Sequence, residues 1–141
     1  MTSEQSETKE INLVLPVKSG MELIAAKLTD KLGKIKGFDQ KTIDEIKLAT
    51  IEACLNAFEH GVSDEKSIKV DFFCSQEKID VTVQDSGKGF DPKLVASPEI
   101  AEKFKSDYKR GWGIKIITEL MDKVDFASDS KGTKVTMTKF K

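Results

Sequence analysis

The chain has 141 residues, 38% of them hydrophobic and 33% charged, which is typical of one globular domain large enough to bury a core. Its 23 basic and 24 acidic residues nearly balance, which excludes the strongly basic surface of a nucleic-acid-binding protein. No apolar run is long enough to cross a bilayer and the polar first residues do not resemble a signal peptide, so we expect a cytoplasmic protein that makes no membrane contact.

The first two elements are predicted to be an edge strand and a helix. Residues 1–9 are rich in Ser, Thr, Glu and Gln and are expected to form a disordered tail. Ile11–Leu15 has the composition of a strand, and Pro16 confines that strand to the edge of a sheet. Apolar residues at helical spacing follow, and they predict a helix that Ser19 caps and Gly37 ends.

The second helix is largely apolar and is predicted to run from a cap at Asp39 to a stop at Gly61. Glu52, Asn56 and His60 recur every four residues along it, so they share one face. A carboxylate and a carboxamide on a buried helix are costly unless other groups pair with them. This face therefore either satisfies backbone groups of a neighbouring element or lines a pocket, and the helix alone does not decide between the two.

The second half of the chain is predicted to contain four strands, a long loop and a helix. Four segments have strand composition or alternate at period two: 67–75, 78–84, 124–128 and 133–138. Gln76 and Glu77 connect the first two of them as an antiparallel hairpin. A long loop then runs from Asp85 to Arg110, and an amphipathic helix follows Gly113.

This order of elements predicts that residues 10–141 form an α+β two-layer sandwich. It favours a mixed, mostly antiparallel sheet that helices cover on one face. We expect Phe72, Phe73 and Phe126 in the core. Two cysteines and a single histidine are too few for a zinc site, so we expect Cys54 and Cys74 to be buried free thiols.

Two glycine-containing segments are weak signals when each is taken alone. Asp85 ends a predicted strand and is followed by Gly87 and Gly89, a pattern that most often marks only a turn. The segment Arg110–Gly113 places two glycines at the expected start of a helix. Because a helix N-terminus exposes N–H groups and the positive end of the helix dipole, it is a suitable phosphate site, to which Arg110 adds a charged donor.

The Glu52/Asn56/His60 helix face and these two glycine-containing segments follow one another along the chain. Together they resemble the nucleotide-binding boxes of the GHKL ATPases, which have the Bergerat fold. This family includes the ATPase domains of gyrase, chaperones, histidine kinases and mismatch-repair proteins. The N box resembles Glu52–Ala57 with His60 and Gly61, the G1 box Asp85–Phe90, the G2 box Arg110–Ile114, and the last adenine-side element Gly132–Val135. The resemblance covers residues 10–140 and is greatest to the single-domain anti-sigma-factor serine/threonine protein kinases.

The resemblance implies that the chain binds ATP and Mg²⁺. It assigns Asn56 to Mg²⁺, which prefers oxygen ligands, and it assigns Glu52 to general-base catalysis. It assigns Asp85 to the adenine amino group and Arg110 to the charge on the transferred phosphate. The rest of the implied cofactor-binding set is Gly87, Gly89, Phe90, Gly111, Trp112, Gly113, Ile114 and Thr133.

For function, the resemblance implies a serine/threonine protein kinase that sequesters a sigma factor and phosphorylates an anti-anti-sigma (STAS-domain) protein on serine. It also implies a homodimer that forms through the first strand and the first helix. Two alternatives stay open: a nucleotide-gated regulatory binding module that transfers no phosphate, and a stand-alone ATPase domain of a two-component-type system.

Overall fold

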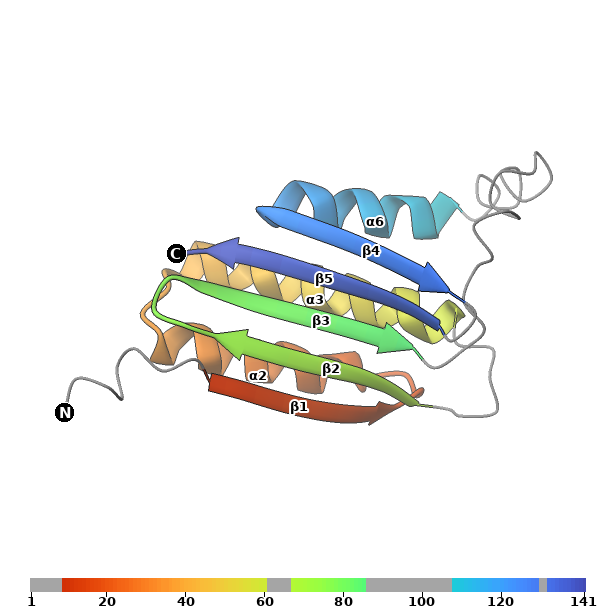
Figure 1. The fold of residues 1–141 in the computed structure, drawn as a ribbon, viewed down its shortest axis with the longest axis horizontal. Helices are drawn as coiled ribbons and strands as arrows, with labels where there is room; N and C mark the ends of the chain where they lie inside the picture. Colours follow the sequence, from red (N-terminus) through yellow and green to blue (C-terminus); the bar gives the residue numbers. More distant parts are fainter. Residues whose placement is uncertain (1–8, 61–66, 86–107, 130–131) are drawn as a thin grey trace.

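The computed structural model describes residues 9–60, 67–85, 108–129 and 132–141, which form two layers. In chain order the elements are β1 (Lys9–Pro16), α2 (Glu22–Ile35), α3 (Gln40–His60), β2 (Ser67–Cys74), β3 (Lys78–Asp85), α6 (Tyr108–Leu120), β4 (Lys123–Asp129) and β5 (Gly132–Phe140). Figure 1 shows these helices on one face of the five-stranded sheet. The predicted α+β two-layer sandwich is confirmed.

The sheet has the strand order β1-β2-β3-β5-β4, and each described pair of neighbouring strands is antiparallel. The predicted mixed sheet is therefore wrong in this respect. In Figure 1, α6 brings the chain back to the end where β3 begins, so β4 runs in the same direction as β3. The following hairpin places β5 between them, antiparallel to both. No helix within the described ranges is long and apolar enough to cross a membrane.

β1 is an edge strand, as Pro16 predicts. It lies at one end of the sheet order and pairs with β2, and Pro16, which has no N–H to donate, is its last residue. The strand begins at Lys9, two residues before the predicted start at Ile11. Lys9 therefore belongs to the sheet rather than to the predicted tail, and residues 1–8 lie outside the described part of the chain.

α2 begins without the side-chain cap that was predicted at Ser19. Its N-cap residue is Met21, which makes no side-chain capping bond. The N–H of Gly20 instead donates to the carboxylate of Glu22 (2.8 Å), and the N–H of Met21 donates to the Lys18 carbonyl in a turn. Backbone and carboxylate oxygens, rather than the Ser19 hydroxyl, thus accept the N–H groups at the start of this helix.

The connection between α2 and α3 confirms both predicted boundaries. Gly37 has a positive φ of 78°, and the N–H of Phe38 donates to the carbonyl of Gly33 (2.9 Å), which is the pattern of a Schellman C-cap. At the next helix, the N–H of Thr42 donates to the carboxylate of Asp39 (2.7 Å). This hydrogen-bonding lowers the pKa of Asp39, so the cap is charged at neutral pH.

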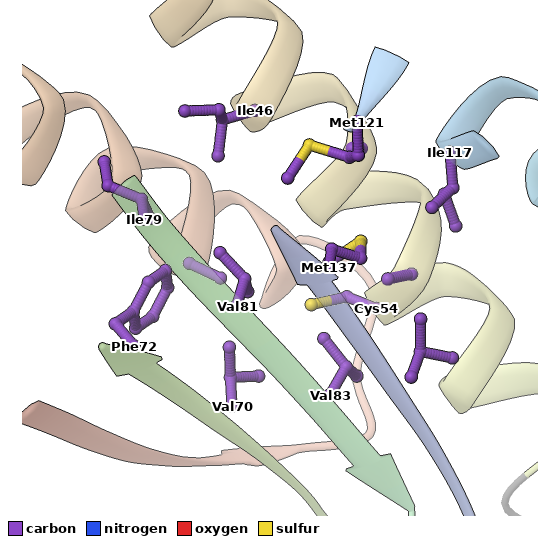
Figure 2. Packing of buried hydrophobic residues seen from close by; sticks show 14 of the residues in the cluster. Ile46, Cys54, Val70, Phe72, Ile79, Val81, Val83, Ile117, Met121 and Met137 are labelled. Carbon is purple, nitrogen blue, oxygen red and sulfur yellow. The ribbon is translucent and has the colours of Figure 1, made fainter. Parts of the chain in front are cut away.

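The core lies between α3 and the central strands, with contributions from α2 and α6. Alternate residues of β2 and β3 point toward the helices, and the same pattern continues on β5. Figure 2 shows how these side chains pack, among them Ile46, Cys54, Val70, Phe72, Ile79, Val81, Val83, Ile117 and Met137. Phe72 is fully buried as expected. The core prediction was wrong for Phe73, which points to the other face of β2 and is only half-buried, and for Phe126, which lies on the edge strand β4 and is 45% exposed.

Candidate functional site

Within the described residues, the segments that carry the predicted site lie at one end of the molecule. Figure 1 shows that the last turn of α3, the end of β3, the start of β5 and the first turn of α6 all lie at this end. α3 contacts α6, β3 and β5 directly, so these elements are packed together there. The fold therefore brings together segments that are far apart in the sequence.

α3 carries Asn56 into the protein interior. Asn56 is 9% exposed, and its neighbours Ala53 and Ala57 are buried in the core. Its Oδ1 is buried and has no hydrogen-bond partner among the described residues. An unsatisfied buried oxygen of this kind costs about 1–3 kcal/mol. No backbone group of the described neighbouring elements pairs with this oxygen, which favours the pocket-lining alternative for this face.

Glu52 lies one helical turn before Asn56, on the same face of α3, and is half-buried. Between them, Ala53 and Cys54 point toward the core, whereas Leu55 is 38% exposed. Glu52 is thus held on a rigid, buried helix, with its carboxylate on the side where Asn56 presents its oxygen. His60 is the last residue of the helix, as predicted.

Cys54 lies beneath this face and is chemically inert. Burial and, to a smaller extent, the negative charge of Glu22 raise the pKa of its thiol from 9.0 to about 12. Since the thiolate is the reactive form, this cysteine is no nucleophile at neutral pH. Both cysteines are free and buried, as predicted, and the described residues contain no cluster of His, Cys, Asp and Glu suited to a metal ion.

The end of β3 presents a second buried polar group, the carboxylate of Asp85. Asp85 is 3% exposed, and its Oδ1 accepts the backbone N–H of Thr133 from the start of β5 (3.1 Å). The fold thus brings together two residues of the implied cofactor-binding set, and the main chain of Thr133 makes the contact. A carboxylate only accepts hydrogen bonds, so this site suits a ligand group that donates one.

α6 begins at Tyr108, so the segment Arg110–Gly113 lies inside the helix rather than before it. The predicted helix start after Gly113 was wrong. In an α-helix the N–H groups without an internal partner belong to the first four residues, here 108–111. Figure 1 shows that this end of α6, with the positive end of its dipole, is at the same end of the molecule as the end of α3.

Some predicted site residues fall where the structure describes little or nothing. Gly87, Gly89 and Phe90 lie outside the described residues. The structure describes only the backbone of residues 110–113, and the half-buried Ile114 is the first residue of that motif whose side chain is described.

Sequence reasoning missed Lys139, which holds the other end of α6. Its side chain is 14% exposed, and its Nζ donates to the carbonyl of Leu120, the last residue of the helix (2.5 Å). The carboxylates of Glu45 and Asp122 lie 3.7 and 3.9 Å from the same nitrogen. A cation at a helix C-terminus is favourable, but no local signal separates this lysine from the others in the chain.

The fold therefore combines a buried helix that carries an acid and an amide with a neighbouring strand that ends in a buried carboxylate. The chain matches the model of the histidine kinase-like ATPase domain over residues 20–139. It belongs to this family, and the resemblance found in the sequence is confirmed.

Curated relatives match almost the full chain. The chain is 30% identical to the serine-protein kinase RsbW of Halalkalibacterium halodurans, over 99% of this chain and 87% of the relative. It is 28% identical to the serine-protein kinase RsbW of Listeria monocytogenes serotype 4a, over 93% of this chain and 87% of the relative.

Solved structures share the fold at low sequence identity. The structure of the RsbU and RsbW domains of a Mycobacterium tuberculosis protein has a TM-score of 0.70 and 18% identity. That match covers 94% of this chain but only 32% of the other chain. The SiaB–SiaC complex of Pseudomonas aeruginosa gives a TM-score of 0.62 and 9% identity, over 99% of this chain and 92% of the other.

Proposed function

We propose that this chain is an ATP-dependent serine-protein kinase of a partner-switching system. In this proposal it sequesters a sigma factor and phosphorylates a serine of an anti-anti-sigma (STAS-domain) protein in the cytoplasm. The serine-protein kinase names of relatives that match nearly the whole chain support the activity. The observation that carries the proposal is the unpaired, buried Oδ1 of Asn56, one turn from the carboxylate of Glu52.

The described residues fit a bound magnesium nucleotide. Asn56 offers an oxygen ligand that is already buried and unpaired among the described residues, which suits Mg²⁺. Asp85 offers a buried acceptor for the adenine amino group. The N-terminus of α6 offers N–H groups to the phosphates, and the motif there contains Arg110. When bound, ATP supplies the phosphoryl group that is transferred, and Mg²⁺ neutralises part of its charge.

Glu52 is the proposed general base. A serine hydroxyl must lose its proton as its oxygen attacks phosphorus, and a carboxylate held beside it can accept that proton. Arg110 is proposed to stabilise the charge that develops on the phosphoryl oxygens. The other proposed cofactor-binding residues are Gly87, Gly89, Phe90, Gly111, Trp112, Gly113, Ile114 and Thr133.

The test is a phosphotransfer assay with Glu52→Gln. The purified chain is incubated with Mg-ATP and an STAS-domain protein of the same organism, and phosphoserine is measured by mass spectrometry. Glu52→Gln should lower the transfer rate by about 10²-fold or more, because general-base catalysis contributes a factor of this size. Its affinity for ATP should stay within about threefold of wild type, because Glu52 is proposed to act on the hydroxyl and not on the nucleotide.

The matched control is Glu77→Gln, an equally conservative change in the exposed β2–β3 turn, at the opposite end of the sheet. This variant should transfer phosphate at the wild-type rate. Normal transfer by Glu52→Gln would overturn the assignment of the base. Tight ATP binding by the wild-type chain with no phosphate on any captured partner would support the nucleotide-gated binding module instead.

We also propose that the chain forms a homodimer through β1 and α2. Three exposed apolar side chains on these elements support this surface: Val14 (67% exposed), Leu23 (53%) and Ile24 (44%). Burial of apolar side chains such as these against a second copy would remove apolar area from water, which favours association.

A further inference from the structure

The start of β5 makes an unusual contact with the end of β3. The described backbone pairing of these strands ends at Gln84 and Lys134. One residue further along, the N–H of Thr133 donates to the side chain of Asp85 (3.1 Å). An antiparallel ladder is normally built of backbone N–H and carbonyl groups, so here a carboxylate accepts an N–H of the strand. The contact joins residues 48 positions apart.

Gly132 allows this contact because it has no side chain. A Cβ at this position would lie 2.2 Å from the backbone oxygen of Asp85 and 3.0 Å from its Oδ1. The φ of Gly132 is +140°, which L side chains rarely adopt. Because the nearest atom belongs to the backbone, no side-chain rotation can relieve the clash. Any other residue would push the start of β5 away from Asp85 and draw the N–H of Thr133 away from the carboxylate.

The orientation of the Asp85 carboxylate has a direct chemical consequence. Adenine presents an amino donor where guanine presents a carbonyl acceptor. A carboxylate accepts a hydrogen bond from the former and repels the latter. Asp85 can discriminate between them only while its oxygens are held in one orientation, and within the described residues the N–H of Thr133 is a fixed donor that holds one of them.

We infer that Gly132 is a positioning residue, which sets the preference for adenine over guanine nucleotides by keeping the Thr133 N–H on the Asp85 carboxylate. The inference rests on the proposed ATP site and adds to it a residue that touches no ligand itself. It acts through Asp85 alone.

The experiment compares Gly132→Ala with Gly37→Ala in the full chain. Gly37 also has a positive φ (78°), but a Cβ there would meet only the flexible end of Lys141, and Gly37 lies at the opposite end of the molecule. Dissociation constants for Mg-ATP and Mg-GTP are measured by titration calorimetry. In Gly132→Ala, affinity for ATP should fall about tenfold or more while affinity for GTP changes little, because a misoriented Asp85 loses its charged hydrogen bond to the adenine amino group. Gly37→Ala should keep the wild-type ATP to GTP ratio.

The combined variant Gly132→Ala/Asp85→Ala tests whether Gly132 changes the ATP to GTP preference only through Asp85. Asp85→Ala alone should lose the preference for ATP, and adding Gly132→Ala should change the ratio no further. A further fall in the ratio, or a wild-type ratio in Gly132→Ala, would overturn the inference. If wild-type protein binds neither nucleotide, the proposed function fails as well, and the two failures are thereby distinguished.

If Gly132→Ala does not fold, hydrogen exchange of the Thr133 amide tests the bond to Asp85 on which the inference depends. The Thr133 amide of the wild-type chain should be protected from hydrogen exchange, and Asp85→Ala should speed its exchange about tenfold or more, with the amide of Val135 unchanged. Equal exchange of the Thr133 amide in both proteins would overturn the inference.

Discussion

At the scale of single residues, the site contains a group that is unfavourable for the nucleotide-free fold. The Oδ1 of Asn56 is buried without a partner among the described residues, although almost all buried polar groups in proteins are paired. A group in this condition is expected where a ligand completes its hydrogen-bonding. The proposed role of Asn56 as a magnesium ligand would account for this local cost to stability.

The variant Asn56→Leu separates the effect of Asn56 on stability from its proposed effect on Mg-ATP binding. Leucine has a similar size and no unsatisfied oxygen, so the free energy of unfolding of the nucleotide-free variant should stay within about 1 kcal/mol of wild type. The stabilisation by Mg-ATP, which should reach about 2.7 kcal/mol at a hundredfold excess over Kd in the wild type, should disappear. Thermal unfolding with and without Mg-ATP measures both quantities. Retained stabilisation by Mg-ATP would contradict the role of Asn56.

The two thiols predict a loss of stability in alkaline solution. Burial raises the pKa of Cys54 to about 12 and that of Cys74 to about 11, from 9.0. Below pH 9 both thiols are protonated in the folded and in the unfolded chain, so their contribution to the free energy of unfolding is fully present and does not change with pH. Above pH 9 the unfolded chain releases these protons while the folded chain keeps them, so the free energy of unfolding should fall by about 1.4 kcal/mol per pH unit for each thiol, up to the folded-state pKa.

Urea unfolding of the wild type and of Cys54→Ala/Cys74→Ala between pH 8 and about pH 11 measures this effect. Lysines titrate in the same range in both proteins, so the difference between the two pH dependences of the free energy of unfolding is due to the thiols. The same pH dependence in both proteins would contradict the raised thiol pKa values.

At the scale of elements, α2 and α3 approach closely because Gly33 has no side chain. A Cβ on Gly33 would lie 2.5 Å from Cγ1 of Ile43, a fully buried residue of α3. The sequence shows only a glycine inside a helix, which is normally unfavourable there. The close approach of α3 explains why position 33 is a glycine.

Gly33→Ala should therefore destabilise the fold by about 1–3 kcal/mol, despite the better helix propensity of alanine. Urea unfolding measures the change. In the double variant Gly33→Ala/Ile43→Ala the loss should be smaller than the sum of the two single losses, because Ile43→Ala removes the clashing atom. Strict additivity would contradict the contact.

At the scale of the whole molecule, the position of a strand in the sheet decides what its side chains do. Phe72 lies on β2 and points into the core, whereas Phe126 lies on the edge strand β4 and is 45% exposed. Both occur in segments of strand composition, and both were expected in the core. The helices cover Phe72 and leave Phe126 partly exposed to solvent.

This pair supplies a matched test. Phe72→Ala should cost about 3–5 kcal/mol, a large fraction of the 5–15 kcal/mol by which a domain is stable. Phe126→Ala should cost about 1 kcal/mol or less, because far less of its surface is removed from water. The midpoints of urea unfolding, with unchanged slopes, measure both. Equal losses in the two variants would contradict the burial described for Phe126.

Much of the fold and part of the site could be predicted because the signals were local. The end of α2 at Gly37 and the start of α3 at Asp39 depend on backbone groups within one turn. The prediction at Ser19 was wrong because the helix begins two residues later, after a backbone turn in which the N–H of Met21 donates to the carbonyl of Lys18. The assignments of Asn56 and Arg110 stay predictions, since their ligands have not been tested.

Periodicity and short motifs were enough to predict the types and order of the elements, the buried helix with its polar face, and the family. The burial of one aromatic residue rather than another, the need for a glycine at position 33, and the contact of Gly132 and Thr133 with Asp85 became visible in the folded molecule. These features depend on residues that are far apart along the chain. A contact between strands 48 residues apart leaves no periodic or local trace, and it exists only once the sheet has formed.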